Sequence, residues 1–348
     1  MPDRDVIVVG ASAGGIEALT ALLPALPAGL DAAVLIVLHM PSGGGQALQR
    51  ILGRSSALPV VLAADGDPLT SGRVYLAVGD HHLLLGPGVM RVRRGPRENG
   101  HRPAVDPLFR SAAAFYGPRV IGVVLSGSLS DGAAGLSSIR RRGGLAVVQD
   151  PEDALYDGMP TSAMDQAGAD FVSPAVEMGA LLARLVGERT GPVDPVPDRL
   201  LSSEVEPTDD GETVDHHPGR PSPWPCPDCN GVLWEVEDGP VLRFRCRVGH
   251  AWSAESLLAQ QAEGVEGAIW MALRALEDRA ALTRRLAERA EVDRRPLSAA
   301  RYRGELSGMT RNIEIMRRLF VSRRTGSRGG PDEAAREGTT VAEDEADV

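Results

Sequence analysis

Five short runs of aliphatic residues in the first half of the sequence most constrain the fold. They span residues 6–9, 34–38, 74–77, 120–125 and 145–148. Each run is apolar at every position, whereas a strand with one solvent-facing side would alternate apolar and polar residues. Helical patterns lie between the runs or after them, over residues 15–23, 46–53, 106–114, 133–142 and 161–167. The pattern predicts a three-layer α/β fold, in which helices cover both faces of a mostly parallel sheet.

The composition changes after residue 187 and divides the chain. Residues 1–187 carry the α/β pattern, interrupted by a β-hairpin expected around the turn Gly86-Pro87-Gly88. Residues 188–220 hold nine acidic residues, three arginines and scattered prolines. They predict a linker, because so few apolar groups cannot offset the entropy lost on ordering. A zinc-ribbon-like module is expected at 221–254, a helical hairpin or coil at 255–322 and a disordered tail at 323–348.

Two long amphipathic helices are expected in the third part of the chain. They cover about residues 255–290 and 297–322, with Pro296 before the second. The apolar side chains expected near one face of the first helix are Leu258, Val265, Ile269, Leu276 and Leu286. Two helices of this length, joined by a short connection, form a hairpin or pair with a second copy. A homodimer through residues 255–322 is therefore one interpretation.

Charge and hydropathy exclude several classes of protein. The chain has 47 acidic and 37 basic residues and a net charge of −10. Nucleic-acid binding is therefore not expected, because it calls for a basic surface. The acidic N-terminus does not resemble a signal peptide, and no stretch offers the roughly 20 clean apolar residues of a membrane span. We expect a cytoplasmic protein without membrane insertion.

Three polar residues follow three of the predicted strands. Ser12 lies in the turn Gly10-Ala11-Ser12-Ala13-Gly14, His39 follows the second run, and Asp131 lies in the glycine-rich segment after the 120–125 run. Functional groups of α/β proteins collect at the carboxyl ends of strands. Serine, histidine and aspartate are the members of a hydrolytic triad. The Ala13 and Gly14 amides, at the start of a helix, would stabilise an oxyanion.

Other readings of the same residues have less support. A dinucleotide site would need Gly-x-Gly-x-x-Gly and an acidic residue after the second strand, where His39 stands. An α/β-hydrolase would place its serine after several earlier strands and order its triad Ser, Asp, His. Asp80 and Asp150 are rival acids to Asp131. We interpret His81, His82 and His101 as surface or loop residues, and Arg102 and Arg110 as candidates for the mouth of the site.

Taken together, several motifs resemble the catalytic domain of CheB, the chemotaxis receptor protein-glutamate methylesterase. They are residues 10–15, His39-Met40-Pro41, residues 102–113, Asp131-Gly132-Ala133-Ala134-Gly135 and Gly158-Met159-Pro160. The resemblance covers about residues 4–187. It implies that Ser12 is the nucleophile, His39 the base and Asp131 the acid that orients it. Because the first strand starts at residue 6, a stand-alone catalytic domain without the usual receiver domain is expected.

The resemblance also implies a reaction. It would be hydrolysis of glutamate γ-methyl esters on a methylated receptor or transducer protein, through an acyl-enzyme and with release of methanol. Glutamine deamidation is the side activity that goes with it. The family usually has Thr-Gly-Met-Gly where this chain has Ser126-Gly127-Ser128-Leu129, so the Ser128 amide would replace that of methionine in the oxyanion site. The alternatives are a non-catalytic binding module on the same fold and a serine esterase with a non-receptor substrate.

A cysteine cluster forms the second motif. Cys226 and Cys229 form a Cys-x-x-Cys knuckle, and Cys246 and His250 follow after a stretch of sixteen residues that reads as a β-hairpin. Three thiolates and one imidazole suit tetrahedral Zn²⁺. A redox Cys-x-x-Cys would call for a thioredoxin-like fold and would leave Cys246 and His250 unexplained. We therefore expect a structural zinc ion and no cofactor for catalysis.

Overall fold

The computed structural model describes residues 3–192, 219–238 and 241–326. The chain divides into two compact units, Met1–Gln261 and Ala262–Val348. The predicted linker at 188–220 and the predicted tail at 323–348 fall in large part, at 193–218 and 327–348, outside the described residues.

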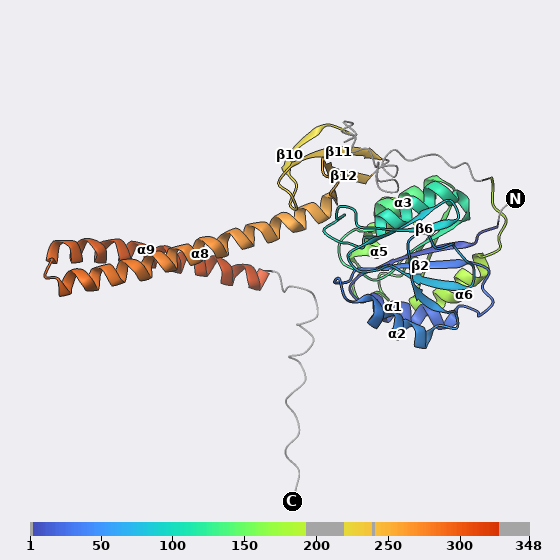
Figure 1. The fold of residues 1–348 in the computed structure, drawn as a ribbon, viewed down its shortest axis with the longest axis horizontal. Helices are drawn as coiled ribbons and strands as arrows, with labels where there is room; N and C mark the ends of the chain where they lie inside the picture. The colour runs from blue at the N-terminus through green and yellow to red at the C-terminus, as the bar shows by residue number, and fades with distance from the viewer. Residues whose placement is uncertain (1–2, 193–218, 239–240, 327–348) are drawn as a thin grey trace, which may run out of the picture. The chain divides into compact units, whose positions relative to one another are not determined.

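The first unit is built on a seven-stranded sheet (Figure 1). Its strands are β1 (Val6–Ala11), β2 (Ala33–Leu38), β3 (Val60–Leu62), β4 (Arg73–Leu76), β7 (Val120–Val124), β8 (Leu145–Gln149) and β9 (Phe171–Ser173). Their order is β3-β4-β2-β1-β7-β8-β9, and every neighbouring pair is parallel. The predicted α/β class is confirmed. Sequence analysis missed the edge strands β3 and β9, which have only three residues each.

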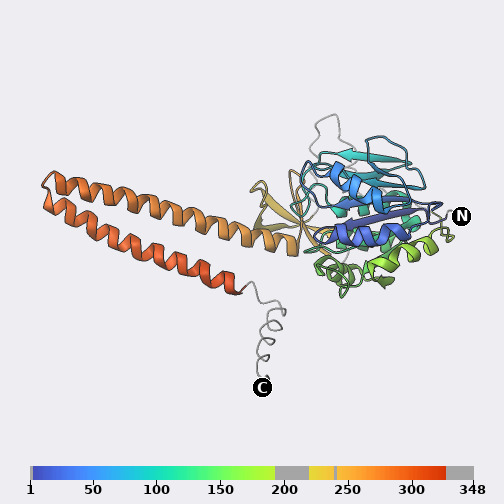
Figure 2. The ribbon, with the colours of Figure 1, turned by 90° about the horizontal axis from the view of Figure 1, so that it is seen from below.

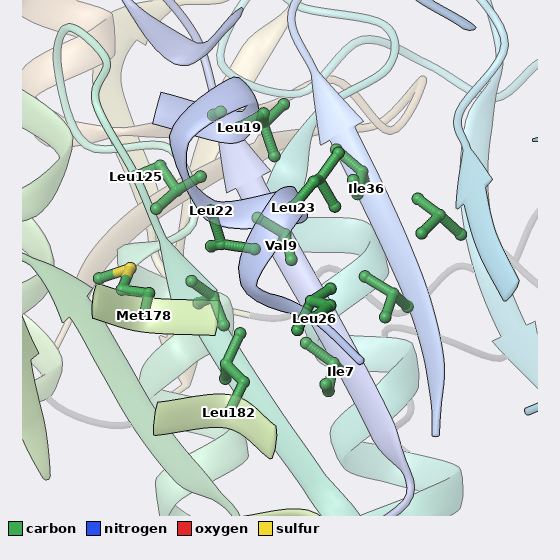
Figure 3. Close-up of a cluster of buried hydrophobic side chains, with 14 of the residues drawn as sticks. Ile7, Val9, Leu19, Leu22, Leu23, Leu26, Ile36, Leu125, Met178 and Leu182 are labelled. Atoms are coloured by element: carbon green, nitrogen blue, oxygen red, sulfur yellow. The ribbon is translucent and has the colours of Figure 1, made fainter. Parts of the chain in front are cut away.

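Helices cover both faces of this sheet. One face carries α1 (Gly15–Leu22), α2 (Gly45–Ser55) and α6 (Ala175–Leu185), and the other carries α3 (Val105–Tyr116), α4 (Ala133–Arg141) and α5 (Gly158–Ala167). Short 3-10 turns follow α1 and α3, at η1 (Leu23–Ala25) and η2 (Gly117–Arg119). The expected hairpin forms from β5 (His82–Gly86) and β6 (Val89–Arg93). Figure 3 shows Ile7 and Val9 of β1 packed among Leu19, Leu22 and Leu182, in the core between the sheet and the first helical layer.

Strand order decides where a site can form. β1 pairs with β2 on one side and with β7 on the other. The chain builds outward from β1 through β2 and later returns to the opposite side of β1, so β1 is a topological switch point. In open α/β sheets ligands bind at the carboxyl ends of the strands at such a point. The segments that follow β1, β2 and β7 therefore meet at one sheet edge.

A small antiparallel sheet follows in the same unit, and we refer to residues 219–253 as the ribbon. Its strands are β10 (Pro221–Pro225), β11 (Val232–Asp238), β12 (Val241–Cys246) and β13 (Ala251–Ser253), in that order. The central pair β11 and β12 was predicted, and β10 and β13 were missed. Its core consists of Cys226, Leu233, Phe244, Cys246 and Trp252, together with Leu257 of the helix that follows. A core this small needs additional stabilisation from a metal or from packing on a larger domain.

Two long helices, α8 (Ala254–Val292) and α9 (Pro296–Gly326), run side by side in opposite directions (Figures 1 and 2). The buried positions of α8 in the second unit include Leu273, Ala280 and Ala287, which repeat every seven residues. The expected apolar face was wrong in part, since Val265 and Leu286 are exposed. The buried face of α8 therefore combines Leu273 with the small residues Ala280 and Ala287, and it does not include Val265 and Leu286. Among the described residues, none of the helices has the length and apolarity that a membrane span requires.

Candidate functional site

Ser12 stands in a tight turn between β1 and α1. Its backbone amide donates to the Ser126 carbonyl over 3.0 Å, and the Gly15 amide donates to the Ser12 carbonyl over 2.9 Å. Gly14 has a φ of 72°, and a Cβ placed on it would lie 2.5 Å from the Ser126 hydroxyl oxygen. Only glycine fits this backbone at this distance. The turn holds the Ser12 hydroxyl at the sheet edge beside the segment that follows β7.

His39 connects the other two residues predicted for the site. It follows β2, and its amide donates to the Ala11 carbonyl over 3.2 Å. The ring Nδ1 lies 3.0 Å from Ser12 Oγ, and Nε2 lies 2.7 Å from Asp131 Oδ2. Both the His39 and Asp131 side chains are buried. The structure thus brings together Ser12, His39 and Asp131, from three separate strand ends, in one hydrogen-bonded chain.

The Asp131 carboxylate lies at the N-terminus of α3. It accepts hydrogen bonds from the Val105 amide (2.7 Å), the Asp106 amide (3.3 Å) and Asn99 Nδ2 (3.0 Å). Burial opposes the ionisation of this group, but the hydrogen bond and charge of His39 and the Val105 amide outweigh it and hold the Asp131 pKa below its ordinary value. Asp131 is therefore a carboxylate, which only accepts hydrogen bonds.

This ionisation state sets the roles of the two ring nitrogens of His39. Because the carboxylate of Asp131 can only accept, Nε2 must carry the ring proton. When the ring is neutral, Nδ1 has a free lone pair directed at Ser12 Oγ and accepts the hydroxyl hydrogen. A serine hydroxyl with a neutral imidazole acceptor at 3.0 Å, and a carboxylate behind the ring, can be activated as a nucleophile.

Asp106 is a second buried carboxyl beside Asp131, and sequence analysis did not single it out. Its Oδ1 accepts from the Gly132 amide (3.1 Å) and the Gly135 amide (2.6 Å), at the start of α4. Burial, together with the negative charges of Asp131 and Glu98, raises the pKa of Asp106 to about 7. The pKa values of the two neighbouring carboxyls are thus displaced in opposite directions. The negative charge stays on Asp131, the group that contacts His39.

His101 lies in a turn, as expected for a surface or loop residue, and its ring lies against the ring of His39. The two rings stack with centroids 3.7 Å apart and planes inclined by 14°. Burial, together with the charge that His39 carries when it is protonated, lowers the pKa of His101 to about 4, so His101 is neutral at neutral pH. The neutral ring of His101 limits the orientations open to the His39 ring, and it adds no positive charge that would repel a protonated His39. Only its closeness in sequence to the 102–113 motif pointed towards this role.

The remaining candidates have structural contacts elsewhere. Asp80 accepts from Arg102 Nε and Arg94 Nε, both over 2.9 Å, so it is a partner of arginines and not of His39. Arg110 is buried and bonds to Glu98 over 2.6 and 2.8 Å, which contradicts its expected place at the mouth of the site. His82 is buried in β5, with Nε2 2.8 Å from the Pro96 carbonyl oxygen, so its expected place on the surface or in a loop was wrong.

The loop after β7 comes very close to Ser12. The Gly127 amide donates to the Tyr156 carbonyl over 3.0 Å, and the Met159 amide donates to the Gly127 carbonyl over 2.7 Å. Leu129 has a φ of 64°, an uncommon and strained value for a leucine. Within the described residues the Ala13 and Ser128 amides have no hydrogen-bond acceptor in the protein. Two of the three amides predicted as oxyanion donors are therefore unpaired in the described part of the chain, one on each segment that flanks the serine.

Substituting Gly127 tests this close approach. A Cβ on Gly127 would lie 2.9 Å from Ser12 Cβ and 2.1 Å from Met159 Sδ, so Gly127→Ala must displace the serine or the loop. We expect esterase kcat to fall by about 10²-fold, because displacements near 1 Å have effects of that size. Steady-state kinetics with a chromogenic ester measures the change. Gly53→Ala is the control, since nothing lies within 4 Å of its Cβ position; equal rates for both variants would refute the close packing.

Glu98 makes a buried ion-pair cluster that predicts a pH effect on stability. It pairs with Arg110 of α3 and with Arg243 of β12. Burial raises the pKa of Glu98, but the two arginines outweigh burial and lower it from 4.5 to about 2. A carboxyl whose pKa is lower in the folded state than in the unfolded state stabilises the folded state at pH values above its unfolded-state pKa. This stabilisation is lost as the pH falls towards the folded-state pKa.

We expect Glu98 to make the free energy of unfolding decrease by about 3 kcal/mol as the pH falls from 4.5 to 2. In Glu98→Gln this part of the pH dependence should disappear, although the variant is less stable at every pH because two buried arginines lose their partner. Urea unfolding over this pH range measures it. Glu152→Gln, at an exposed site, is the control, and an unchanged pH slope in Glu98→Gln would contradict the assignment.

Cys226, Cys229, Cys246 and His250 come together in the ribbon, as the sequence predicted. Their ligand atoms all lie within 4.8 Å of one another, so the four residues could hold a metal ion. Cys229 Sγ is 3.7 Å from Cys246 Sγ, and Cys246 Sγ is 3.5 Å from His250 Nδ1. A tetrahedral ion with ligand bonds of about 2.3 Å requires sulfur atoms about 3.8 Å apart. The spacing of the donors fits such an ion.

Comparisons with known proteins cover the α/β part of the chain. The sequence profile of the family described as CheB methylesterase matches residues 7–182. The chain is 40% identical over 191 residues to the protein-glutamate methylesterase/protein-glutamine glutaminase 2 of Methanosarcina mazei, covering 53% of this chain and 52% of that protein. The chain is also 40% identical over 186 residues to the protein-glutamate methylesterase/protein-glutamine glutaminase 3 of Geobacter metallireducens, covering 52% of this chain and 52% of that protein. The crystal structure of the Thermotoga maritima CheB methylesterase catalytic domain matches with a TM-score of 0.51 and 34% identity, over 52% of this chain and 98% of that one. The chain spans about half the length of the curated relatives it matches.

Proposed function

Because the chain belongs to the CheB methylesterase family, we propose that it is a serine esterase that demethylates glutamate γ-methyl esters on receptor-type proteins. The observation that carries this proposal is the hydrogen-bonded chain from Ser12 Oγ through His39 to Asp131, with distances of 3.0 and 2.7 Å. The catalytic domain in this proposal is residues 1–187. Substrates would be methylated receptor or transducer proteins, and catalysis would use no cofactor.

The proposed reaction proceeds in two steps. Ser12 Oγ attacks the ester carbonyl carbon while its proton passes to His39 Nδ1, and the tetrahedral intermediate places its negative charge towards the Ala13 and Ser128 amides. Nδ1 then protonates the leaving methoxide, which departs as methanol and leaves an acyl-Ser12. In the second step His39 removes a proton from water and the hydroxide attacks the acyl carbon. Ser12 Oγ then leaves and takes that proton back from His39 Nδ1, and glutamate is released. Asp131 stabilises the imidazolium in both steps.

A γ-amide could follow the same route. Attack by Ser12 on a glutamine side chain would expel ammonia in place of methanol, with the same proton transfer through His39. This deamidation is the side activity proposed for the site. The relatives named above carry both activities in their names, as methylesterase and glutaminase.

For the ribbon we propose a structural zinc ion. Its ligands would be Cys226, Cys229, Cys246 and His250, and Asp228 Oδ2 lies 4.0 Å from His250 Nε2, where it can orient the ring. With four protein ligands the ion has no open position for water or substrate, so its role would be structural. The three cysteines form no disulfide, so all three sulfur atoms can serve as thiolate ligands.

Covalent labelling separates the esterase from a non-catalytic module on the same fold. A fluorophosphonate is expected to modify the full chain once, at Ser12, because only a serine beside a general base reacts at a useful rate. Peptide mass spectrometry locates the label, and His39→Ala should slow labelling strongly. A chain that stays unlabelled would favour the non-catalytic binding module. If Ser12 is labelled and added methylated receptor protein does not slow the labelling, the result would favour a serine esterase with a different substrate.

Self-association through residues 255–322 remains a prediction. Within the second unit, α8 exposes the large apolar side chains Trp270 and Met271. Burying such side chains against a second copy would be favourable. Light scattering coupled to size-exclusion chromatography should give twice the chain mass of 36.8 kDa, with a shift towards the monomer in a Trp270→Glu, Met271→Glu variant. A single-chain mass at micromolar concentration would contradict it.

A cytoplasmic location likewise remains a prediction, which cell fractionation would test.

A further inference from the structure

A four-residue turn at 98–101 lies between the ribbon and the Ser12–His39–Asp131 site. The Glu98 and His101 backbones bond to each other in both directions, over 3.1 and 2.9 Å. Asn99 and Gly100, at the tip, both have positive φ values, of 52° and 76°. His101 stacks on His39, while Gly100 faces the ring of Trp252 in β13, 3.5 Å from its Cβ position. The same turn therefore contacts the site with one end and the ribbon with its tip.

Asn99 connects the two most directly. Its backbone amide donates to the Ala251 carbonyl over 2.8 Å, and its side-chain Oδ1 accepts from the Ser253 amide over 2.7 Å. Its Nδ2 donates to Asp131 Oδ1 over 3.0 Å and to Asp106 Oδ2 over 3.3 Å. Asn99 is only 5% exposed, so water cannot replace a lost partner easily. The ribbon thus orients the amide group that binds the aspartate of the site.

An ion pair fixes the same turn from its other side. Arg243 of β12 reaches across to Glu98, which also binds Arg110 of α3, and all three side chains are almost completely buried. Arg243 lies directly opposite Ser253 in the pairing of β12 with β13. One two-strand segment of the ribbon therefore supplies both the cation for Glu98 and the amide for Asn99. A shift of these strands would disturb both contacts together.

The ribbon also touches the residue that precedes Asp131. Ser130 Oγ lies 2.8 Å from Ser253 Oγ and donates to Glu255 Oε2 over 3.1 Å. Ser130 is 2% exposed. The backbone of Asp131 is thus held from Ser130, and its carboxylate from Asn99, by contacts that both lead to the end of β13.

We propose that the ribbon is a positioning element for the triad, and that metal bound by its cysteine cluster controls turnover by holding β12 and β13 in place. Two of the four ligands lie where β12 connects to β13, since Cys246 ends β12 and His250 immediately precedes β13. The inference rests on the proposed esterase function and adds a means of regulating it. Asn99 and Arg243 are positioning residues here, because they act through Asp131 and Glu98 and do not touch the ester.

The substitution test uses Arg243 in the full chain. Arg243→Ala keeps the pair between Glu98 and Arg110, so the catalytic domain should still fold, and kcat should fall between about tenfold and 10²-fold. KM should change little, because the contact orients Asp131 and does not bind substrate. Arg243→Lys, which retains a cation, should recover part of the rate. Arg247→Ala, an exposed arginine of the ribbon, should leave both constants unchanged.

The metal test compares the zinc-loaded full chain with the chain after chelation, and with Cys226→Ser. Amide hydrogen exchange provides a readout that needs no activity. Removing the metal should expose the amides of Asn99, Val105 and Asp106, which lie in the turn and against Asp131, while β7 in the sheet centre stays protected. The rate of fluorophosphonate labelling of Ser12 should fall in parallel, between about tenfold and 10²-fold.

The outcomes separate the two proposals. If the loaded chain is active, and neither Arg243→Ala nor metal removal changes kcat or the exchange of Asn99 and Val105, the ribbon does not position the triad and the inference is overturned. Failure of the chain to bind zinc would overturn the metal dependence in the same way. If the loaded chain neither labels nor turns over, the esterase proposal fails, while exchange at Asn99 and Val105 still reports whether the ribbon holds Asp131.

Discussion

Ser12→Ala is expected to lower kcat for ester hydrolysis by about 10⁴- to 10⁶-fold, the range found when a triad serine is removed. The substitution deletes the atom that attacks the carbonyl, and the alanine methyl group cannot accept or donate the proton that His39 carries. The residual rate should come from water in the oxyanion site. Single-turnover kinetics of a chromogenic ester, measured over hours for the variant, gives the ratio.

The fold should survive this change, because Ser12 contributes to the turn through its backbone amide and carbonyl. Circular dichroism and the unfolding midpoint should therefore match those of the unmodified chain. Ser42→Ala is the matched control, since Ser42 is an exposed serine three residues beyond His39. If Ser12→Ala and Ser42→Ala hydrolysed the ester equally fast, the nucleophile would have to be another residue.

Removal of the metal is expected to have the largest effect on stability. Structural zinc contributes of order 10–16 kcal/mol apparent to small modules of this kind. The core has five buried residues of the ribbon and Leu257 of α8, and two of the five, Cys226 and Cys246, are themselves proposed ligands. Without the ion the remaining apolar contacts should not hold the four strands together.

Metal release and ribbon unfolding can be followed in one experiment. A chromophoric chelator should report one zinc ion per chain, and the fluorescence of buried Trp252 should shift to longer wavelength as the ion leaves. The far-ultraviolet signal of the helices should remain, because the large sheet has its own core. A chain that binds no zinc, or whose tryptophan spectrum is unchanged by chelation, would contradict the proposed metal centre.

The central strands of the fold could be predicted because burial on both faces leaves a simple mark on the sequence. The strands β1 and β2 are buried at every position, so every residue in them is apolar. The strands β3 and β9 lie at the sheet edges and are only partly buried. Three-residue runs such as Val60–Leu62 look the same in loops and strands, and their pairing is decided by the rest of the sheet.

The site could be predicted in part. Ser12, His39 and Asp131 each follow a recognisable strand, and neighbouring parallel strands end at the same edge. Asn99 and His101 follow no strand, and they reach the site only because the 98–101 turn folds back onto Asp131. That path depends on contacts with β13, more than 150 residues further along the chain. No local pattern encodes such a contact.

The helical hairpin shows how periodicity can mislead. One apolar face was expected on α8, but several faces of a long helix carry apolar residues at similar spacing. The larger side chains Val265 and Leu286 favoured one face, whereas Ala280 and Ala287 are the residues that are buried. Close packing of two helices selects small residues as readily as large ones. The partner helix is therefore needed to choose the face.

Methanol release from a methylated receptor domain tests the central claim most directly. The purified, zinc-loaded chain is mixed with receptor protein carrying isotopically labelled glutamate methyl esters, and volatile methanol is counted over time. We expect the chain to release methanol with many turnovers per molecule, and Ser12→Ala to release none above background. No release by the intact chain, or equal release by Ser12→Ala, would contradict the assignment of this site as a methylesterase.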